Sequence, residues 1–132
     1  MKKGSKILLS IVLLIVIIAG GVSLFMRYQI NQTYKRLDEI AVVDLSEVED
    51  GIYEGTEETD LVKATVVVTV KDHRITDIQL TRHENGKGTA AEAMIPEMIR
   101  QNTSEVDVTT GATMSGKTIK ASVRKALAQG VQ

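Results

Sequence analysis

The chain has 132 residues and a formal net charge of −1, which allows one small domain plus one accessory segment and leaves no overall positive charge for binding nucleic acid. It contains no cysteine, so disulfides, thiolate catalysis and iron–sulfur clusters are excluded, together with most zinc sites. Its histidines are His73 and His83, so a histidine-based metal site would need carboxylates as further ligands, and we predict no metal site.

An uncharged and almost entirely apolar run occupies residues 7–26. Twenty helical residues at about 1.5 Å each span roughly 30 Å, which matches the hydrocarbon core of a bilayer. The run exceeds the usual apolar length of a secretory signal, so the sequence predicts an uncleaved transmembrane helix with residues 1–6 in the cytoplasm. A cleaved signal, with the small residues 19–21 as its cleavage site, is the alternative.

The charges on the two sides of this run are balanced. Three lysines precede it, and Arg27, Lys35 and Arg36 follow it, so charge alone does not set the orientation. A signal-anchor normally sends the C-terminal part of a chain outward. We therefore predict a single-pass protein of the cell membrane, with the lipid bilayer as a partner and residues 40–132 on the extracytoplasmic side.

The segment after the apolar run is acidic. Residues 38–60 contain ten Asp and Glu residues and no Lys or Arg. The run lacks the spaced aspartates of an EF-hand loop, so it predicts a solvated stretch rather than a calcium site. We interpret residues 27–49 as a stalk and acidic linker, and residues 50–132 as the domain.

The first half of the domain is rich in β-branched residues. Residues 52–55 are predicted as a short strand, and residues 61–70 and 74–80 as two longer strands. Asp72 and His73 stand between the two longer strands, which predicts a hairpin about a short turn.

The second half of the domain is predicted to be helical. Residues 89–92 have the capping-box form that begins a helix, and Pro96 suits either the first turn of a second helix or a kink in one helix. Residues 106–108 are predicted as a short strand or an extended piece. Residues 116–128 place apolar side chains on one face, which predicts a closing amphipathic helix with its basic side chains outside: Lys117, Lys120, Arg124 and Lys125.

Strands precede helices in this order. The sequence therefore predicts an α+β fold, a small antiparallel sheet with helices packed on it, preceded by one transmembrane helix. Tyr53 is the one aromatic residue after position 40, so the core is predicted to consist of aliphatic side chains and methionine.

The segment 106–118 contains two overlapping motifs. Residues 111–118, GATMSGKT, satisfy the P-loop formula G-x-x-x-x-G-K-[ST]. A P-loop requires a doubly wound α/β domain after it, with an acidic metal ligand on a later strand. Only fourteen residues follow Thr118, so the architecture argues against nucleotide binding.

The second motif is D-x-x-T-G-A-T at residues 107–113. Here the chain resembles the FMN-binding domain family, whose members carry D-x-x-[ST]-G-A-[ST] just before a C-terminal helix. The resemblance extends from about residue 50, through the predicted hairpin, to the closing helix. It implies FMN as the cofactor, attached covalently as a phosphoester by a separate flavin transferase that splits FAD with the help of a metal ion.

The resemblance also implies roles for the residues of the motif. Thr113 carries the flavin through its side-chain oxygen, Thr110 orients the segment, and Asp107 is recognised by the transferase or holds the loop. The small side chains of Gly111 and Ala112 let the transferase and the phosphate approach the backbone. The predicted cofactor site continues with Met114, Ser115 and Lys117, the last as a cationic contact to the phosphate. Helix capping and turn formation are the alternative interpretation of these residues.

Three residues outside the motif are further candidates for flavin contacts. His83 and Gly86 lie in the segment HENGKG, which resembles the family's His- and Gly-containing loop but departs from its longer H-x-E-T-x-G-x-G form. Tyr53 is the aromatic side chain available to the flavin ring. A turn role for the first two residues and sheet packing for Tyr53 are the alternatives.

Two functions follow from this interpretation. In the first, the protein is a membrane-tethered flavin carrier that passes electrons between an unknown donor and an unknown acceptor, a redox subunit rather than a stand-alone enzyme. In the second, it is a membrane-anchored interaction or sensing module of the same fold that carries no flavin.

Overall fold

The computed structural model describes residues 2–84, 89–108 and 111–131 and divides into two units, Met1–Thr33 and Tyr34–Gln132. The first unit consists of most of α1 (Lys3–Asp38), whose last turn, residues 34–38, belongs to the second unit. The side chains of its apolar stretch are exposed. By length and composition α1 is a candidate membrane span, in agreement with the sequence.

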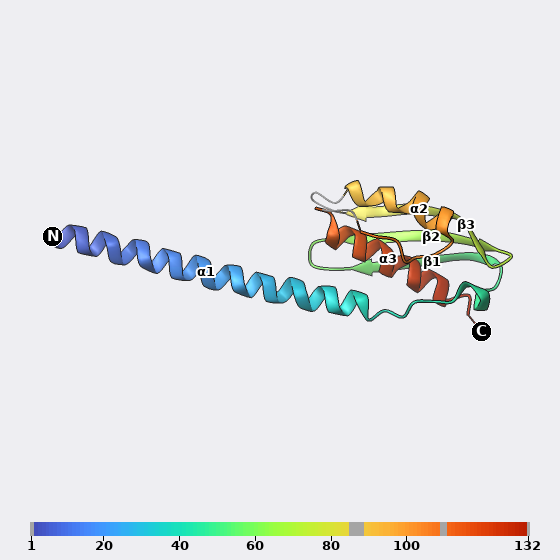
Figure 1. Cartoon of the computed structure of the whole chain (residues 1–132), viewed down its shortest axis with the longest axis horizontal. Coiled ribbons are helices and arrows are strands. Elements are labelled where there is room, and N and C mark those ends of the chain that lie inside the picture. Colours follow the sequence, from blue (N-terminus) through green and yellow to red (C-terminus); the bar gives the residue numbers. More distant parts are fainter. Residues whose placement is uncertain (1, 85–88, 109–110, 132) are drawn as a thin grey trace. The chain divides into compact units, whose positions relative to one another are not determined.

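The second unit contains a three-stranded antiparallel sheet in the order β1-β2-β3 (Figure 1). The strands are β1 (Gly51–Glu58), β2 (Lys63–Lys71) and β3 (Arg74–Glu84). Every second side chain of β2 is buried, because one face of the sheet is covered. Asp72 and His73 have φ values of 50° and 60°, as a type I′ turn requires. The predicted strands and hairpin are confirmed, although β1 and β3 are longer than expected.

The helices of the second unit are η1 (Leu45–Glu47), η2 (Thr89–Ala93), α2 (Met94–Gln101) and α3 (Thr113–Ala128). The helix start predicted at residue 89 is a 3₁₀ turn that continues into α2. Pro96 lies in the first turn of α2, where its missing N–H is tolerated. Residues 105–108, before α3, have no regular secondary structure and, within the described residues, are not part of the sheet. The closing helix begins three residues earlier than predicted.

Helices α2 and α3 cover the same face of the sheet, with α3 against β1 and β2 and α2 against β3 (Figure 1). Gly55 lets the backbones of β1 and α3 touch, since a Cβ there would lie 2.0 Å from the Ser122 carbonyl oxygen. The Ser122 hydroxyl donates to the Ala64 carbonyl at 3.0 Å and so connects α3 to β2. The core is built from aliphatic side chains and methionine, and its largest fully buried apolar members are Leu37, Val48, Val66, Val68, Val70, Met98, Ile119, Val123 and Leu127.

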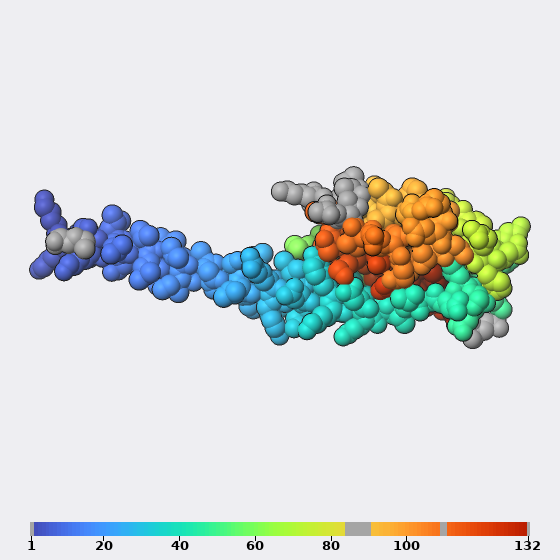
Figure 2. All heavy atoms as spheres, in the orientation of Figure 1, coloured from blue at the N-terminus to red at the C-terminus, as the bar shows by residue number. Residues whose placement is uncertain are grey.

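Helix α3 is enclosed on nearly all sides, since ten of its sixteen residues are buried. The prediction that Arg124 lies outside with the other basic side chains of this helix is wrong, because its side chain is only 7% exposed. The outer side of α3 is covered by residues 34–48, which the sequence interpretation assigned to a stalk and linker. Leu37 and Val48 of this segment are fully buried, and Figure 2 shows the part after α1, in teal, lying along the domain.

Candidate functional site

The predicted attachment residue stands at the start of a helix. Thr113 is the first residue of α3 and follows the N-cap residue Ala112, whose methyl side chain makes no capping hydrogen bond. The first turn contains no acidic residue, and the Gly116 N–H donates to the Ala112 carbonyl at 2.9 Å. The N–H groups of residues 113–115 precede that bond, so together with the positive end of the helix dipole they form a place suited to an anion.

The described hydroxyl groups of α3 differ in their access to solvent. Thr118 and Ser122 are fully buried. The Thr118 hydroxyl donates to the Met114 carbonyl at 2.7 Å, and the Ser122 hydroxyl shares its one proton between the Thr118 and Ala64 carbonyls, at 2.8 and 3.0 Å. Ser115 is 2% exposed. Thr113 is half-buried, and among the described residues its hydroxyl has no hydrogen-bond partner. Thr113 is therefore the hydroxyl of this helix that another molecule can reach.

The chain approaches α3 along residues 105–108, and Val108 packs against the first turn of the helix at Gly116. A Cβ at Gly116 would lie 3.0 Å from both Val108 Cγ1 and Met94 Sδ, so this close packing depends on glycine. Gly111 has a φ of +84° and is exposed, a conformation that glycine adopts without strain.

Asp107 and Thr110 complete the predicted motif. Asp107 is exposed, so its carboxylate is accessible to a modifying enzyme. Thr110 lies outside the described residues.

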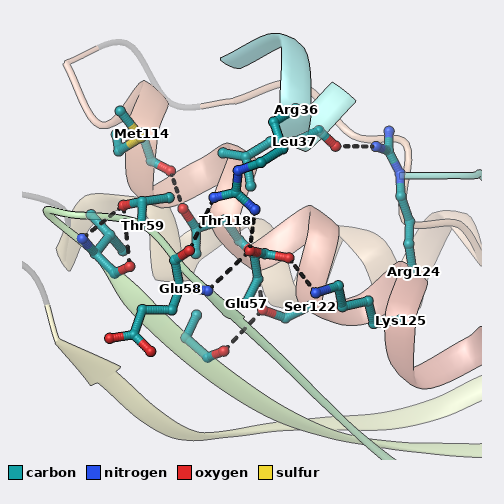
Figure 3. A network of polar contacts seen from close by, with 12 residues as sticks. Arg36, Leu37, Glu57, Glu58, Thr59, Met114, Thr118, Ser122, Arg124 and Lys125 are labelled. Carbon is teal, nitrogen blue, oxygen red and sulfur yellow. Dashed lines mark hydrogen bonds and ion pairs between the residues drawn. The ribbon is translucent and has the colours of Figure 1, made fainter. Parts of the chain in front are cut away.

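Lys117 is engaged by the end of α1. Its Nζ lies 2.7 and 2.8 Å from the two carboxylate oxygens of Asp38 and 5.5 Å from the centre of the Tyr34 ring. Met114 has a half-buried side chain, and the Met114 backbone carbonyl accepts a hydrogen bond from the Thr118 hydroxyl (Figure 3). The Lys117 ammonium group, predicted to contact the phosphate, is thus already paired with the Asp38 carboxylate.

His83 lies in β3 rather than in a turn, so the turn alternative for this residue is wrong. Its side chain is 3% exposed, and its Nδ1 lies 2.9 Å from Oε1 of Glu92 in η2. This contact connects the end of β3 to η2, which in turn packs against α3. Gly86, the other candidate of that segment, lies outside the described residues.

The structure does not bring Tyr53 to Thr113. The Tyr53 hydroxyl donates to the Glu49 carbonyl at 2.7 Å, and its ring lies beside Gly130, just past the C-terminal end of α3. The sixteen residues of α3 separate its two ends by about 24 Å. This placement favours the sheet-packing alternative for Tyr53.

A cavity of about 420 Å³ also borders the C-terminal end of α3. It is lined by residues 43–46, His73, residues 102–104 and Leu127. Because Leu127 lies fourteen residues after Thr113 on the same helix, this cavity is separate from the predicted attachment residue.

A buried carboxylate that sequence reasoning missed connects β1, α3 and the end of α1 (Figure 3). Glu57 is 4% exposed, with Oε1 2.7 Å from Arg36 Nη1 and Oε2 2.5 Å from Lys125 Nζ. Burial alone would raise the pKa of Glu57, but the bonds and charge from Lys125 and Arg36 outweigh it and hold the pKa below its ordinary value. The sequence signal that could have identified it is the spacing of Gly55 and Glu57, which lie two residues apart and therefore on the same face of a strand.

Comparison with protein families decides what kind of domain this is. The family model of the FMN-binding domain matches residues 62–128, just over half of the chain. The chain belongs to the FMN-binding domain family. FMN is therefore the cofactor that its family indicates. No curated protein matches the chain.

The matched part of this FMN-binding domain runs from just before β2 to the end of α3 and includes Thr113. Its described residues fit the phosphate of FMN at the start of α3, since an accessible hydroxyl, free first-turn amides and a first turn without acidic residues occur together there. β1 and residues 34–48 lie outside the match. β1 packs against α3, and residues 37–40 contact it through the bonds of Arg124 and Lys117.

Proposed function

We propose that FMN is held covalently through a phosphoester between Thr113 Oγ1 and the flavin phosphate. The observation that carries this proposal is the half-buried Thr113 hydroxyl at a helix start without a side-chain cap or an acidic residue. A phosphate bound there lies beside the N–H groups of residues 113–115, which stabilise its negative charge. Among the residues that the structure describes, a Cβ at Gly111 would meet nothing within 4 Å, which supports an open approach to Thr113.

A flavin transferase is the enzyme expected to form this bond from FAD. The Thr113 oxygen attacks the flavin-side phosphorus of FAD, the bond between that phosphorus and the bridging oxygen breaks, and AMP leaves. The hydroxyl proton passes to a base of the transferase. The step transfers a phosphoryl group without any change in oxidation state, so it needs no oxidant or reductant.

The proposed role of the loaded protein is that of a membrane-tethered electron carrier. FMN supplies one- and two-electron chemistry, while the protein contributes attachment, tethering and tuning. The apolar run of α1 supports a membrane anchor, and we propose that the domain lies on the extracytoplasmic side. A covalent bond suits that location, because a dissociated flavin would be diluted and lost outside the cell.

Co-expression of the full-length chain with a flavin transferase tests the attachment. Denatured protein is expected to keep flavin fluorescence and a mass increase of one FMN unit, and peptide mapping is expected to place it on Thr113. Thr113→Ser should retain labelling because the phosphoester needs the hydroxyl but not the methyl group, whereas Thr113→Ala should lose it. Ser115→Ala is the matched control and should be labelled like the wild type.

Flavin on a residue other than Thr113, or labelling of Thr113→Ala, contradicts the proposed attachment. A chain that stays unlabelled beside an active transferase instead supports the interaction or sensing module without flavin. Orientation is tested separately, because protease added to intact cells should remove the domain. Protection of the domain would place it in the cytoplasm.

A further inference from the structure

One buried arginine connects the end of α1 to the segment that leads into the attachment motif. Arg124 Nη1 donates to the carbonyls of Leu37 and Ile40 at 3.4 and 3.3 Å, the first of which is drawn in Figure 3. Its Nε and Nη2 donate to the two carboxylate oxygens of Glu105 at 2.9 and 2.7 Å. A bidentate bond to a carboxylate, with a further N–H group donating to backbone carbonyls, requires a guanidinium group.

Both sets of partners are stabilised by this cation. Leu37 lies in the last turn of α1 and Ile40 two residues beyond it, and the Leu37 carbonyl also accepts the Ile40 N–H at 3.3 Å. Carbonyls at the C-terminal end of a helix carry partial negative charge, which a cation stabilises. For Glu105, burial would raise the pKa, but the hydrogen bonds from Arg124 and Ser104, with the charge of Lys120, hold the pKa below its ordinary value. Glu105 is therefore an ionised anchor for the backbone around it.

The segment that begins at Glu105 is held at several points. Val106 is 5% exposed and belongs to the core. Val108 packs against Gly116 in the first turn of α3, the turn that begins with Thr113. Arg124 thus holds Glu105 at one end of residues 105–108, and Val108 at the other end packs against Gly116.

We propose that Arg124 is a positioning residue for flavin attachment: by joining Glu105 to residues 37–40, it fixes residues 105–108, keeps Val108 against the first turn of α3 and presents the Thr113 hydroxyl in one orientation. This inference rests on the proposed function. It makes residues 34–40 part of the scaffold of the attachment site. The Lys117–Asp38 pair is a second connection between the end of α1 and the same region of α3.

Flavinylation kinetics of the full-length chain in detergent, with FAD, Mg²⁺ and a flavin transferase, test this role. Arg124→Met and Glu105→Gln should lower kcat by about 10- to 100-fold with KM for FAD unchanged, because the reacting oxygen is misplaced while FAD binding to the transferase is not affected. Arg124→Lys should recover part of the rate, since it restores the charge without the fork. Glu97→Gln, which breaks the exposed pair of Glu97 and Arg100 on α2, is the matched control and should leave kcat unchanged.

A second measurement separates positioning from a general loss of stability. Leu37→Ala truncates a buried side chain in the last turn of α1 and should lower kcat. Val68→Ala truncates a fully buried side chain of β2 and should lower Tm without lowering kcat. In the flavin-free protein, exchange of the Gly116 amide hydrogen, which bonds the Ala112 carbonyl, should accelerate at least tenfold in Arg124→Met and Glu105→Gln. It should not change in Glu97→Gln.

Wild-type kcat and unchanged Gly116 exchange in Arg124→Met and Glu105→Gln would overturn the inference. A loss of kcat that follows Tm across all variants, Val68→Ala included, would overturn it as well, because it would assign Arg124 a purely structural role. If the wild type itself is not labelled, the proposed function fails. The Gly116 exchange experiment then still decides whether Arg124 holds this turn.

Discussion

The two ends of α3 are built in opposite ways. At the N-terminal end, Thr113 is half-buried at an uncapped start, and exposed Gly111 precedes it. At the C-terminal end, the Gly130 carbonyl accepts the Glu49 N–H at 3.0 Å, and Val131 pairs with Val48 in an isolated bridge. One end is left accessible, and the other is joined to the segment that enters the sheet.

This difference shows how one helix supports both folding and chemistry. The C-terminal half carries buried apolar side chains whose truncation opens a cavity, so substitutions of those apolar residues should act on stability. The N-terminal turn contributes accessible amides and a hydroxyl, so substitutions there should act on flavin attachment with little effect on folding. The following changes test that separation, beginning with the largest expected effect.

Leu127→Ala should cause the largest loss of stability. The side chain is 1% exposed within the core, and comparable truncations lower the free energy of unfolding by about 2–5 kcal/mol. Urea unfolding of the full-length chain, followed by circular dichroism, measures the change. Labelling well below Tm should stay complete, and Leu61→Ala, at a 64% exposed position, should be close to neutral. Strong loss of labelling in folded Leu127→Ala would break the proposed separation of the two ends.

Glu57→Gln should lower stability by about 2 kcal/mol near neutral pH, because it removes hydrogen bonds between charged groups. Its folded-state pKa lies below the ordinary value of 4.5, so the unfolded state binds more protons in that range. The stabilisation is therefore present above about pH 4.5 and is lost as pH falls through the lower, folded-state pKa.

Urea unfolding between pH 3 and 7, roughly the range in which carboxylates titrate, measures this dependence. The wild type should lose stability on acidification more steeply than Glu57→Gln. Glu54→Gln, an exposed position on the same strand, is the control and should follow the wild type. Equal slopes in all three proteins would show that the buried carboxylate does not contribute to acid sensitivity.

Gly111→Ala should cost about 1 kcal/mol, because a residue with a Cβ is strained at a φ of +84°. Crowding is not the cause, since within the described part of the chain a Cβ there meets nothing within 4 Å. The rate of flavinylation should fall more clearly than stability, because the backbone next to Thr113 shifts. Gly111→Asn should lose less of both, since asparagine tolerates this conformation better. A normal labelling rate in Gly111→Ala would show that the left-handed conformation is unnecessary for attachment.

Lys117→Ala should have the smallest effect, under about 1 kcal/mol, because the pair with Asp38 is partly exposed and screened by solvent. Flavin attachment should remain largely intact. Equilibrium binding of labelled ATP is expected to be undetectable in both the wild type and the variant. ATP binding by the wild type that Lys117→Ala abolishes would instead support the P-loop interpretation of residues 111–118.

Local pattern was sufficient for the sheet, the hairpin, the membrane-length helix and the position of the motif before the last helix. Strand β2 is recognisable from its β-branched residues, whose side chains alternate between the two faces of the sheet. The hairpin turn is recognisable from two adjacent residues, Asp72 and His73. The apolar run of α1 is a property of composition alone. These features need no knowledge of the rest of the fold, so the sequence by itself determined them.

The tertiary structure alone decided which side chains surround α3. Helical periodicity identified one apolar face, but it did not reveal that residues 34–48 cover the other side, and for that reason Arg124 was assigned to the surface. The partners of Arg124 lie 19 residues away at Glu105 and 87 residues away at Leu37. Contacts at such separations depend on how packed elements bring distant segments together, and the desolvation that makes them strong arises only after packing.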